Sequence, residues 1–267
     1  MKKLLQLAML FAVATMSANL VNAQSNDAWG TLTGKVVVDG TAPANSPENL
    51  ENSADKAICL VDGKAPLDDN IVVGENGELR DVLVMMFLDR GQDEPAYHPS
   101  YGESKGQAIA IDNAKCRFVP HALFVRPGQT LTLKNSDAVG HNCHITTLNN
   151  EANVNLPPNG SVDIVLKETD KAPGEVVCDV HKWMDAVIMV RDNPYVAITD
   201  AEGNFKIENV PAGNWKFQFW HKKVGWLNKI NVTGKEVGRR GEVELEIKAD
   251  ETLDLGALKL PADSFKE

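Results

Sequence analysis

Short apolar runs with period-two alternation recur along the chain and predict an all-β protein. The runs are rich in Val, Ile, Leu, Thr and Phe, and turn-forming Gly, Pro, Asn and Asp separate them. The clearest run is 242–248, where Val243, Leu245 and Ile247 alternate with glutamates, as in an antiparallel strand with one face in solvent. We predict strands at 31–38, 82–88, 123–125, 131–133, 162–166, 175–177, 186–190, 205–207, 215–220 and 242–248.

Two long segments have the composition of loops. Residues 41–67 contain three prolines among Asn, Ser and Asp, and residues 90–106 contain two prolines and three glycines. Loops of this length are usually functional or held down by other contacts.

The first 23 residues have the pattern of a secretory signal. Lys2 and Lys3 precede the apolar stretch 4–14, and the small residues of 21–23 form a cleavage site after Ala23. Polar residues break the apolar stretch before it reaches the length of a membrane span, and no Cys follows it as a lipid anchor would require. We expect a periplasmic or otherwise exported protein without a membrane span in its mature form.

The charge balance restricts the class of partner. The chain of 267 residues has a net charge of −10, and removing residues 1–23 takes away two lysines and no acidic residue, which leaves −12. An acidic protein is poorly suited to nucleic acid or to anionic lipid. A redox protein that presents a basic or apolar patch is the partner we expect.

Four cysteines, Cys59, Cys116, Cys143 and Cys178, allow two interpretations. In an oxidising compartment they could form two disulfides, with three possible pairings. Alternatively Cys178 binds a metal, which leaves one disulfide and one buried thiol. We favour the second interpretation because His181 and Met184 lie close to Cys178 in the sequence. A Cys59–Cys116 bond would tie the first long loop to the rest of the protein, although the sequence does not demonstrate this pairing.

The most informative motif is Cys178-x-x-His181-x-x-Met184, with His141 37 residues before the cysteine. A thiolate, two imidazoles and a thioether are the ligand set of a blue-copper electron-transfer site. The short spacing suits one tight loop between the strands predicted at 175–177 and 186–190. His144 is the rival upstream ligand, but in an extended strand it points away from the face that carries His141.

These residues belong to a longer stretch, Ala114–Val190, that resembles a small cupredoxin with an amicyanin-type ligand loop. The resemblance rests on Ala114–Phe118 in an early strand, Pro120, Val125–Leu131 entering the next strand, and Asn135 six residues before His141. It implies that one type 1 copper is bound by His141, Cys178, His181 and Met184.

The same resemblance implies roles for the surrounding residues. Asn135 would brace the Cys loop, and Asn142 and Trp183 would lie around the ligands. The edge of His181 would emerge through an apolar surface as the electron exit. Trp183 would shield the copper, contribute to docking or only pack the loop.

Some positions depart from that pattern or remain outside it. Cys143 stands where cupredoxins usually have Val, and we expect a buried apolar group there, with a disulfide or metal contact as alternatives. A binuclear copper centre would need a Cys at position 182, which is Lys. We expect structural roles for His98, His121 and His221, with metal binding by His121 as an open alternative.

The flanking segments resemble a carboxypeptidase-regulatory-like (transthyretin-like) β-sandwich. Thr199–Phe205 and Asn209–Trp215 each contain a hairpin turn, and Gly34–Pro43 is a loose counterpart of the family's opening motif. We predict a discontinuous domain at 29–90 and 195–262, with a cupredoxin Greek-key β-sandwich at 106–192 inserted in it. A tandem arrangement is the alternative. The flanking domain shows no catalytic signature and is expected to be a rigid module.

The sequence thus favours an exported mononuclear type 1 copper protein that carries single electrons between redox partners. We expect no enzyme activity, because a lone blue-copper site lacks an open coordination position and no catalytic triad or phosphate-binding loop is evident. The alternatives are a copper-binding or copper-delivery protein without electron transfer, and a structural cell-envelope protein with a cupredoxin fold.

Overall fold

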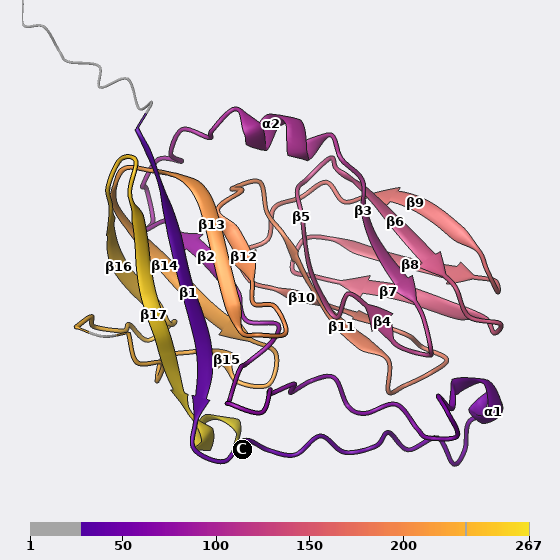
Figure 1. Ribbon diagram of the computed structural model, residues 1–267. Coiled ribbons are helices and arrows are strands. Elements are labelled where there is room, and N and C mark those ends of the chain that lie inside the picture. Colours follow the sequence, from indigo (N-terminus) through magenta and orange to yellow (C-terminus); the bar gives the residue numbers. More distant parts are fainter. Residues whose placement is uncertain (1–27, 233, 267) are drawn as a thin grey trace, which may run out of the picture.

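Two β-sandwiches lie side by side in the protein (Figure 1). The computed structural model describes residues 28–232 and 234–266, so the predicted signal at 1–23 lies outside the described residues. None of the helices in these ranges has the length and hydropathy of a transmembrane span. We call the sandwich built from both ends of the chain the terminal sandwich and the one built from residues 109–190 the central sandwich.

The terminal sandwich combines strands from before and after the central one. In its first sheet β1 pairs with β13 antiparallel and with β17 parallel, and in its second sheet β2 lies between β12 and β14. Its strands are β1 (Trp29–Asp39), β2 (Leu83–Phe87), β12 (Val196–Ile198), β13 (Asn204–Pro211), β14 (Gly213–His221), β15 (Gly225–Trp226), β16 (Glu242–Ile247) and β17 (Thr252–Pro261).

The central sandwich contains all strands from β3 to β11. One sheet has the order β5-β11-β10-β7-β8 and the other the order β4-β3-β6-β9. The strands are β3 (Ile109–Asn113), β4 (Phe118–Val119), β5 (Ala122–Val125), β6 (Thr130–Asn135), β7 (His141–Thr146), β8 (Glu151–Leu156), β9 (Ser161–Val165), β10 (Gly174–Val177) and β11 (Asp185–Val190).

The all-β prediction is confirmed, and the alternation in β16 appears as expected. Val243, Leu245 and Ile247 are buried in the core of the terminal sandwich, while Glu244 and Glu246 are exposed. The helices of the described residues are short: α1 (Lys56–Cys59), α2 (Ser100–Lys105) and a 3-10 helix at Ala262–Phe265.

A third apolar cluster joins the two sandwiches. Leu83 and Met85 of β2 pack with Val187 and Met189 of β11, while the alternate residues of each strand face the core of their own sandwich. Both faces of β2 and β11 are therefore covered, which explains why their sequences are continuous apolar runs. This interface places the strand that follows the metal motif in the middle of the molecule.

Some local predictions were wrong. The segment 90–106, expected as a loop, contains α2, which begins directly after Pro99. Residues 114–117 form a turn between β3 and β4 in place of a strand, because Lys115 and Cys116 have positive φ angles and Ala114 pairs with Arg117.

The topology agrees with insertion of the central sandwich into the terminal one. β2 ends at Phe87 and pairs with β12, which begins at Val196, and all strands of the central sandwich lie between them in the chain. The domain boundaries at 29–90, 106–192 and 195–262 stay predictions. The segment 41–67, which we call the strap, lies outside both sheets of the terminal sandwich and contributes Leu50 and Cys59 to the core of the central one.

Cys59 in α1 forms a disulfide with Cys116, whereas Cys143 and Cys178 are free and buried. The bond closes a loop across 57 residues and fixes the strap on the central sandwich.

Replacing both Cys59 and Cys116 by Ser should lower the free energy of unfolding by about 2–4 kcal/mol in chemical denaturation, because the unfolded chain gains conformational freedom. A reducing agent should cause the same loss in the wild type and none in the variant; an equal effect on both would contradict this assignment.

Candidate metal centre

Strand pairing brings the predicted ligands to one end of the central sandwich. His141 begins β7 and Cys178 follows β10, and β10 is paired with β7 on one side and β11 on the other. The connection from β10 to β11 is tight, since the Cys178 amide donates to the Met184 carbonyl (3.0 Å) and the Met184 amide to the His181 carbonyl (2.8 Å). Residues distant in the sequence are thereby held within one rigid loop and one strand end.

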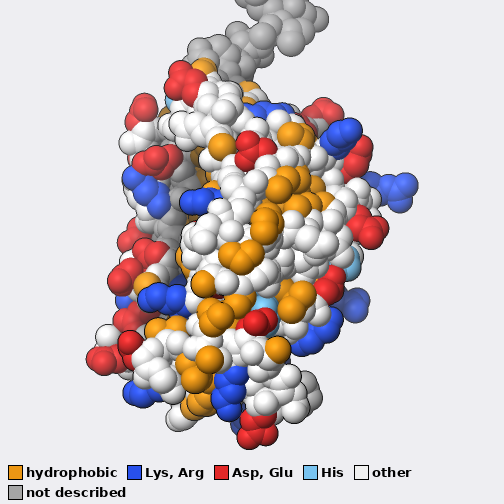
Figure 2. Space-filling view, turned by 90° about the vertical axis from the view of Figure 1, so that its right-hand side faces the viewer, with side chains coloured by type: hydrophobic (Ala, Val, Ile, Leu, Met, Phe, Trp, Pro, Cys, Tyr) orange, Lys and Arg blue, Asp and Glu red, His pale blue; other side chains and the backbone are white. Residues whose placement is uncertain are grey.

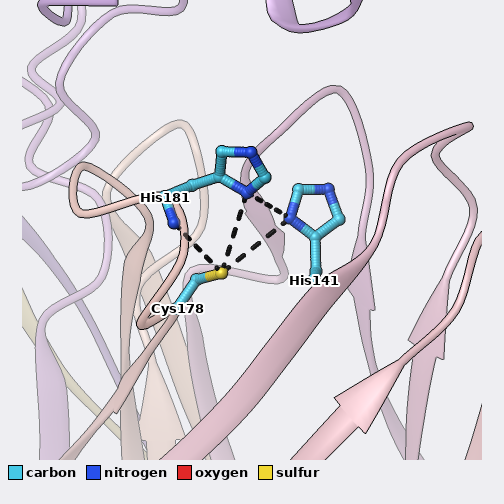
Figure 3. Close-up of side chains that lie close together, drawn as sticks. All are labelled: His141, Cys178 and His181. Carbon is cyan, nitrogen blue, oxygen red and sulfur yellow. Dashed lines mark hydrogen bonds between the residues drawn. The ribbon is translucent and has the colours of Figure 1, made fainter. Parts of the chain in front are cut away.

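Three ligand atoms converge in this place (Figure 3). Cys178 Sγ lies 3.9 Å from His141 Nδ1 and 3.8 Å from His181 Nδ1, and the two Nδ1 atoms are 2.9 Å apart. The exposed fractions are 3 % for His141 and 1 % each for Cys178 and His181. Such buried polar groups facing one another need either a shared ion or mutual hydrogen bonds.

Carboxylates fix the orientation of both imidazoles from outside. His141 Nε2 lies 2.9 Å from Asp137 Oδ2, and His181 Nε2 lies 3.1 Å from Asp55 Oδ2. An ionised carboxylate can only accept, so each Nε2–H donates outwards to its carboxylate, and each Nδ1 faces the cysteine sulfur. This arrangement of carboxylate, histidine and open nitrogen is common around protein metal sites.

The electrostatics favour a thiolate at this position. Burial raises the pKa of Cys178, but hydrogen bonds from His141 and His181 outweigh it and lower the pKa to about 5. Burial lowers the pKa of His141, yet the contacts with Asp137 and Cys178 raise it to about 9. The thiolate, which is the form that binds metals, is therefore present at neutral pH.

The donor set fits copper. A thiolate and two imidazole nitrogens are donors that copper accepts, and the thioether of Met184, 2 % exposed, lies in the same core cluster as Cys178. A second group, Cys116, Asp137 and His141, offers no competing site because the Cys116 sulfur is in the disulfide. The neighbouring carboxylates pair with the outer imidazole nitrogens rather than with the centre.

Asn142, not Asn135, braces the Cys loop. Asn142 Oδ1 accepts from the Asp179 amide (2.6 Å), and its Nδ2 donates to the Asp179 carboxylate (2.9 Å). The Asn135 side chain donates instead to the carbonyls of Val139, Leu156 and Pro157. The expected role of Asn135 was therefore wrong. Asn135 stabilises the turn before His141, and Asn142, the residue after His141, braces the Cys loop.

The expected exit through an exposed His181 edge was also wrong. His181 is 1 % exposed because Asp55 covers its Nε2 and the Trp183 ring lies against it, with ring centroids 5.0 Å apart. The Trp183 indole donates to the Cys116 carbonyl (3.1 Å), next to the disulfide. Trp183 thus shields the centre and links the ligand loop to the turn that holds the strap.

The other candidates lie apart from the three converging ligands. His144 points outwards to Asp179, and buried His121 bonds to Asp81. His98 is near Ser100 on the surface, and His221 is buried against Phe265. Cys143 is a buried free thiol beside Asn113, and burial raises its pKa to about 11.

Sequence reasoning missed both carboxylates. Asp137 also accepts from the amides of Lys115 and Cys116, at 2.6 and 2.8 Å. One side chain thus joins His141 to the turn at 114–117, which contains Cys116 and which we call the disulfide turn. Asp137 stands four residues before His141, and that spacing could have indicated a hydrogen-bond partner for the imidazole. Asp55 stands 126 residues before His181 and gives no sequence signal.

Comparison with known proteins gives similarity over part of the chain. No protein-family model matches the sequence, and no curated protein matches it. Among solved structures, a mutant of amicyanin in its oxidised state is 25 % identical over 32 % of this chain and 82 % of its own, with a TM-score of 0.28. A purple cupredoxin from Nitrosopumilus maritimus is 21 % identical over 30 % of this chain and 97 % of its own, with a TM-score of 0.26.

A copper-containing nitrite reductase from Thermus scotoductus SA-01 is 16 % identical over 32 % of this chain, with a TM-score of 0.29. The chain spans only 22 % of that enzyme's length. These similarities cover about a third of the chain, and the flanking transthyretin-like resemblance has no counterpart among them.

The two free thiols should titrate far apart in the metal-free protein. Cys178 should lose its proton near pH 5 and remain a thiolate above it, whereas Cys143 should stay protonated until about pH 11. Ultraviolet thiolate absorption measures both steps. Cys178→Ser should remove the lower step alone and Cys143→Ser the upper step alone. A single step near the ordinary thiol pKa of about 9 would contradict the pairing of Cys178 with the two histidines.

Proposed function

We propose that this protein is a one-electron carrier with a single type 1 copper bound by His141, Cys178, His181 and Met184. The observation that carries the proposal is the convergence of a buried thiolate and two imidazole nitrogens whose outer nitrogens are tied to carboxylates. Copper bound there would supply reversible one-electron exchange between Cu(I) and Cu(II).

The surrounding residues would limit how far the ligands move during such an exchange. The two backbone hydrogen bonds of the loop fix Cys178 and Met184, the carboxylates fix both imidazoles, and apolar side chains fill the space beneath them. A closely packed core resists rearrangement. Ligands that are preorganised in this way favour fast electron transfer over exchange of the metal with a recipient.

Burial also argues against chemistry on a bound substrate. Catalytic metal sites keep one coordination position open to substrate or water. Here three donors are at most 3 % exposed, and Met184 is buried in the same core cluster as Cys178. We therefore propose a carrier and not an enzyme.

The surface suggests where a redox partner would bind. The large exposed apolar side chains among the described residues all belong to the central sandwich or the strap (Ile58, Leu67, Val119, Leu148, Val162, Val165 and Val180). Figure 2 views the molecule from the side of the central sandwich, and hydrophobic side chains lie among charged ones on this face. With an overall charge of −10, a partner with a basic or apolar patch is the most suitable. Export to the periplasm, which we propose from residues 1–23, would bring the protein together with exported redox partners.

Copper loading of the mature protein tests this function. One copper per chain should give an intense visible thiolate-to-copper band and a reversible wave in voltammetry. Cys178→Ser should abolish the band, and Cys143→Ser, which removes the other free thiol, should retain it. A colourless copper(II) form would contradict a type 1 site. A coloured form that releases copper readily and shows no reversible wave would indicate delivery in place of electron transfer.

Met184 should act through the reduction potential and not through the colour. Met184→Gln, with a harder donor, should keep the visible band and lower the potential, because an oxygen ligand stabilises Cu(II). Met184→Leu, which offers no donor, should keep the band and raise the potential. Voltammetry of both variants measures the change. Equal potentials in the two variants would exclude Met184 as the axial ligand.

A further inference from the structure

The strap (residues 41–67) leaves the terminal sandwich after β1 and crosses to the end of the central one, where α1 lies at the lower right in Figure 1. Two features hold it there: Leu50 and Cys59 are buried in the central core, and Cys59 is bonded to Cys116. The strap is also closed on itself, because the amide of Glu48 donates to the Pro66 carbonyl across its base (2.8 Å). The strap is therefore fixed beside the metal centre.

Asp55 occupies an unusual position within the strap. It stands at the N-cap of α1, where an aspartate normally accepts hydrogen bonds from the first turn of the helix. Its side chain makes no such bond, and Oδ2 lies 3.1 Å from His181 Nε2 instead. The main chain at Asp55 is nevertheless held, because its carbonyl accepts from the amides of Ile58 (2.9 Å) and Cys59 (3.0 Å). The carboxylate is thus directed to the histidine by a fixed backbone.

His181 is enclosed as a result. Asp55 covers its Nε2, the Trp183 ring lies at one side, and the His141 ring lies 4.6 Å away between centroids. The Asp55 side chain is 34 % exposed while that of His181 is 1 % exposed, so the carboxylate stands between the imidazole and solvent. The strap supplies the only contact shown for this nitrogen among the described residues.

We propose that Asp55 is a positioning residue for His181 and lowers the reduction potential of the centre. This rests on the proposed copper function. The carboxylate fixes the Nε2–H tautomer and makes the imidazole a stronger donor, and outer partners of metal-binding histidines act in this way. Its negative charge also stabilises the more highly charged Cu(II) form more than Cu(I).

Three variants separate position from charge. Asp55→Asn keeps the size and a hydrogen-bond acceptor but removes the charge, and Asp55→Ala removes both. Asp62→Asn is the matched control: it removes one charge from an exposed position of the same strap, with no side-chain hydrogen bond to the centre. Its φ angle of 52° is one that asparagine also adopts.

In the copper-loaded protein, voltammetry should show a higher reduction potential for Asp55→Asn and Asp55→Ala than for the wild type. Asp62→Asn should stay near the wild-type value, because an exposed charge is screened by solvent. Equal potentials for the three variants would overturn the effect of Asp55 on the centre. A wild-type protein that binds copper without a visible band would instead overturn the proposed function.

The positioning role has a test that needs no metal. In NMR spectra of the metal-free protein, the His181 Nε2–H should exchange slowly with water in the wild type, Asp62→Asn and Asp55→Asn. In Asp55→Ala it should exchange at least about tenfold faster, the effect of losing one hydrogen bond of ordinary strength. The same slow rate in Asp55→Ala would overturn the positioning role, whatever the copper experiments show.

Discussion

The structure depends on the meeting of one thiolate with two imidazole nitrogens in a space closed to solvent. Three buried polar groups at 2.9–3.9 Å from one another would be costly without a partner ion or strong mutual bonds. Their positions are set by the pairing of β10 with both β7 and β11, which brings a strand end and a short loop together. One face of β11, the strand that follows this loop, then packs through Val187 and Met189 against the terminal sandwich.

A second layer of contacts closes around that centre and joins its two histidines. Asp137 connects His141 to the amides of the disulfide turn, and the disulfide connects that turn to α1, which follows Asp55. Asp55 then reaches His181. The strap consequently does more than link two strands of the terminal sandwich. It covers the side of the ligand loop through which we had expected His181 to reach the surface.

Much of this could be predicted from local sequence pattern. Strands such as β16 alternate cleanly, and the ligand motif has a short spacing that one loop can satisfy. Prediction failed where the pattern is broken by backbone geometry. In β17 the alternating leucines stand at odd-numbered positions first (Leu253 and Leu255) and at even-numbered positions later (Leu258 and Leu260). The alternation shifts by one residue at Gly256, whose φ is +63°. Such a change of phase conceals a strand from a period-two pattern.

Other features could not be predicted because they depend on tertiary contacts. Asp55 and His181 are 126 residues apart, and only the folded strap brings them together. Asn135 and Asn142 are both close to His141 in sequence, and which of them braces the Cys loop depends on side-chain direction. Residues 114–117 were expected in a strand, but Asp137 accepts hydrogen bonds from two of their amides and so stabilises a turn.

X-ray absorption at the copper edge of the copper-loaded protein distinguishes a copper bound by Cys178 from one bound by nitrogen and oxygen alone, because it reports the atoms bound to the metal. We expect one short copper–sulfur distance and two copper–nitrogen distances typical of imidazole, with any second sulfur at a longer distance. A copper surrounded only by nitrogen and oxygen, with no short sulfur contact, would contradict this expectation.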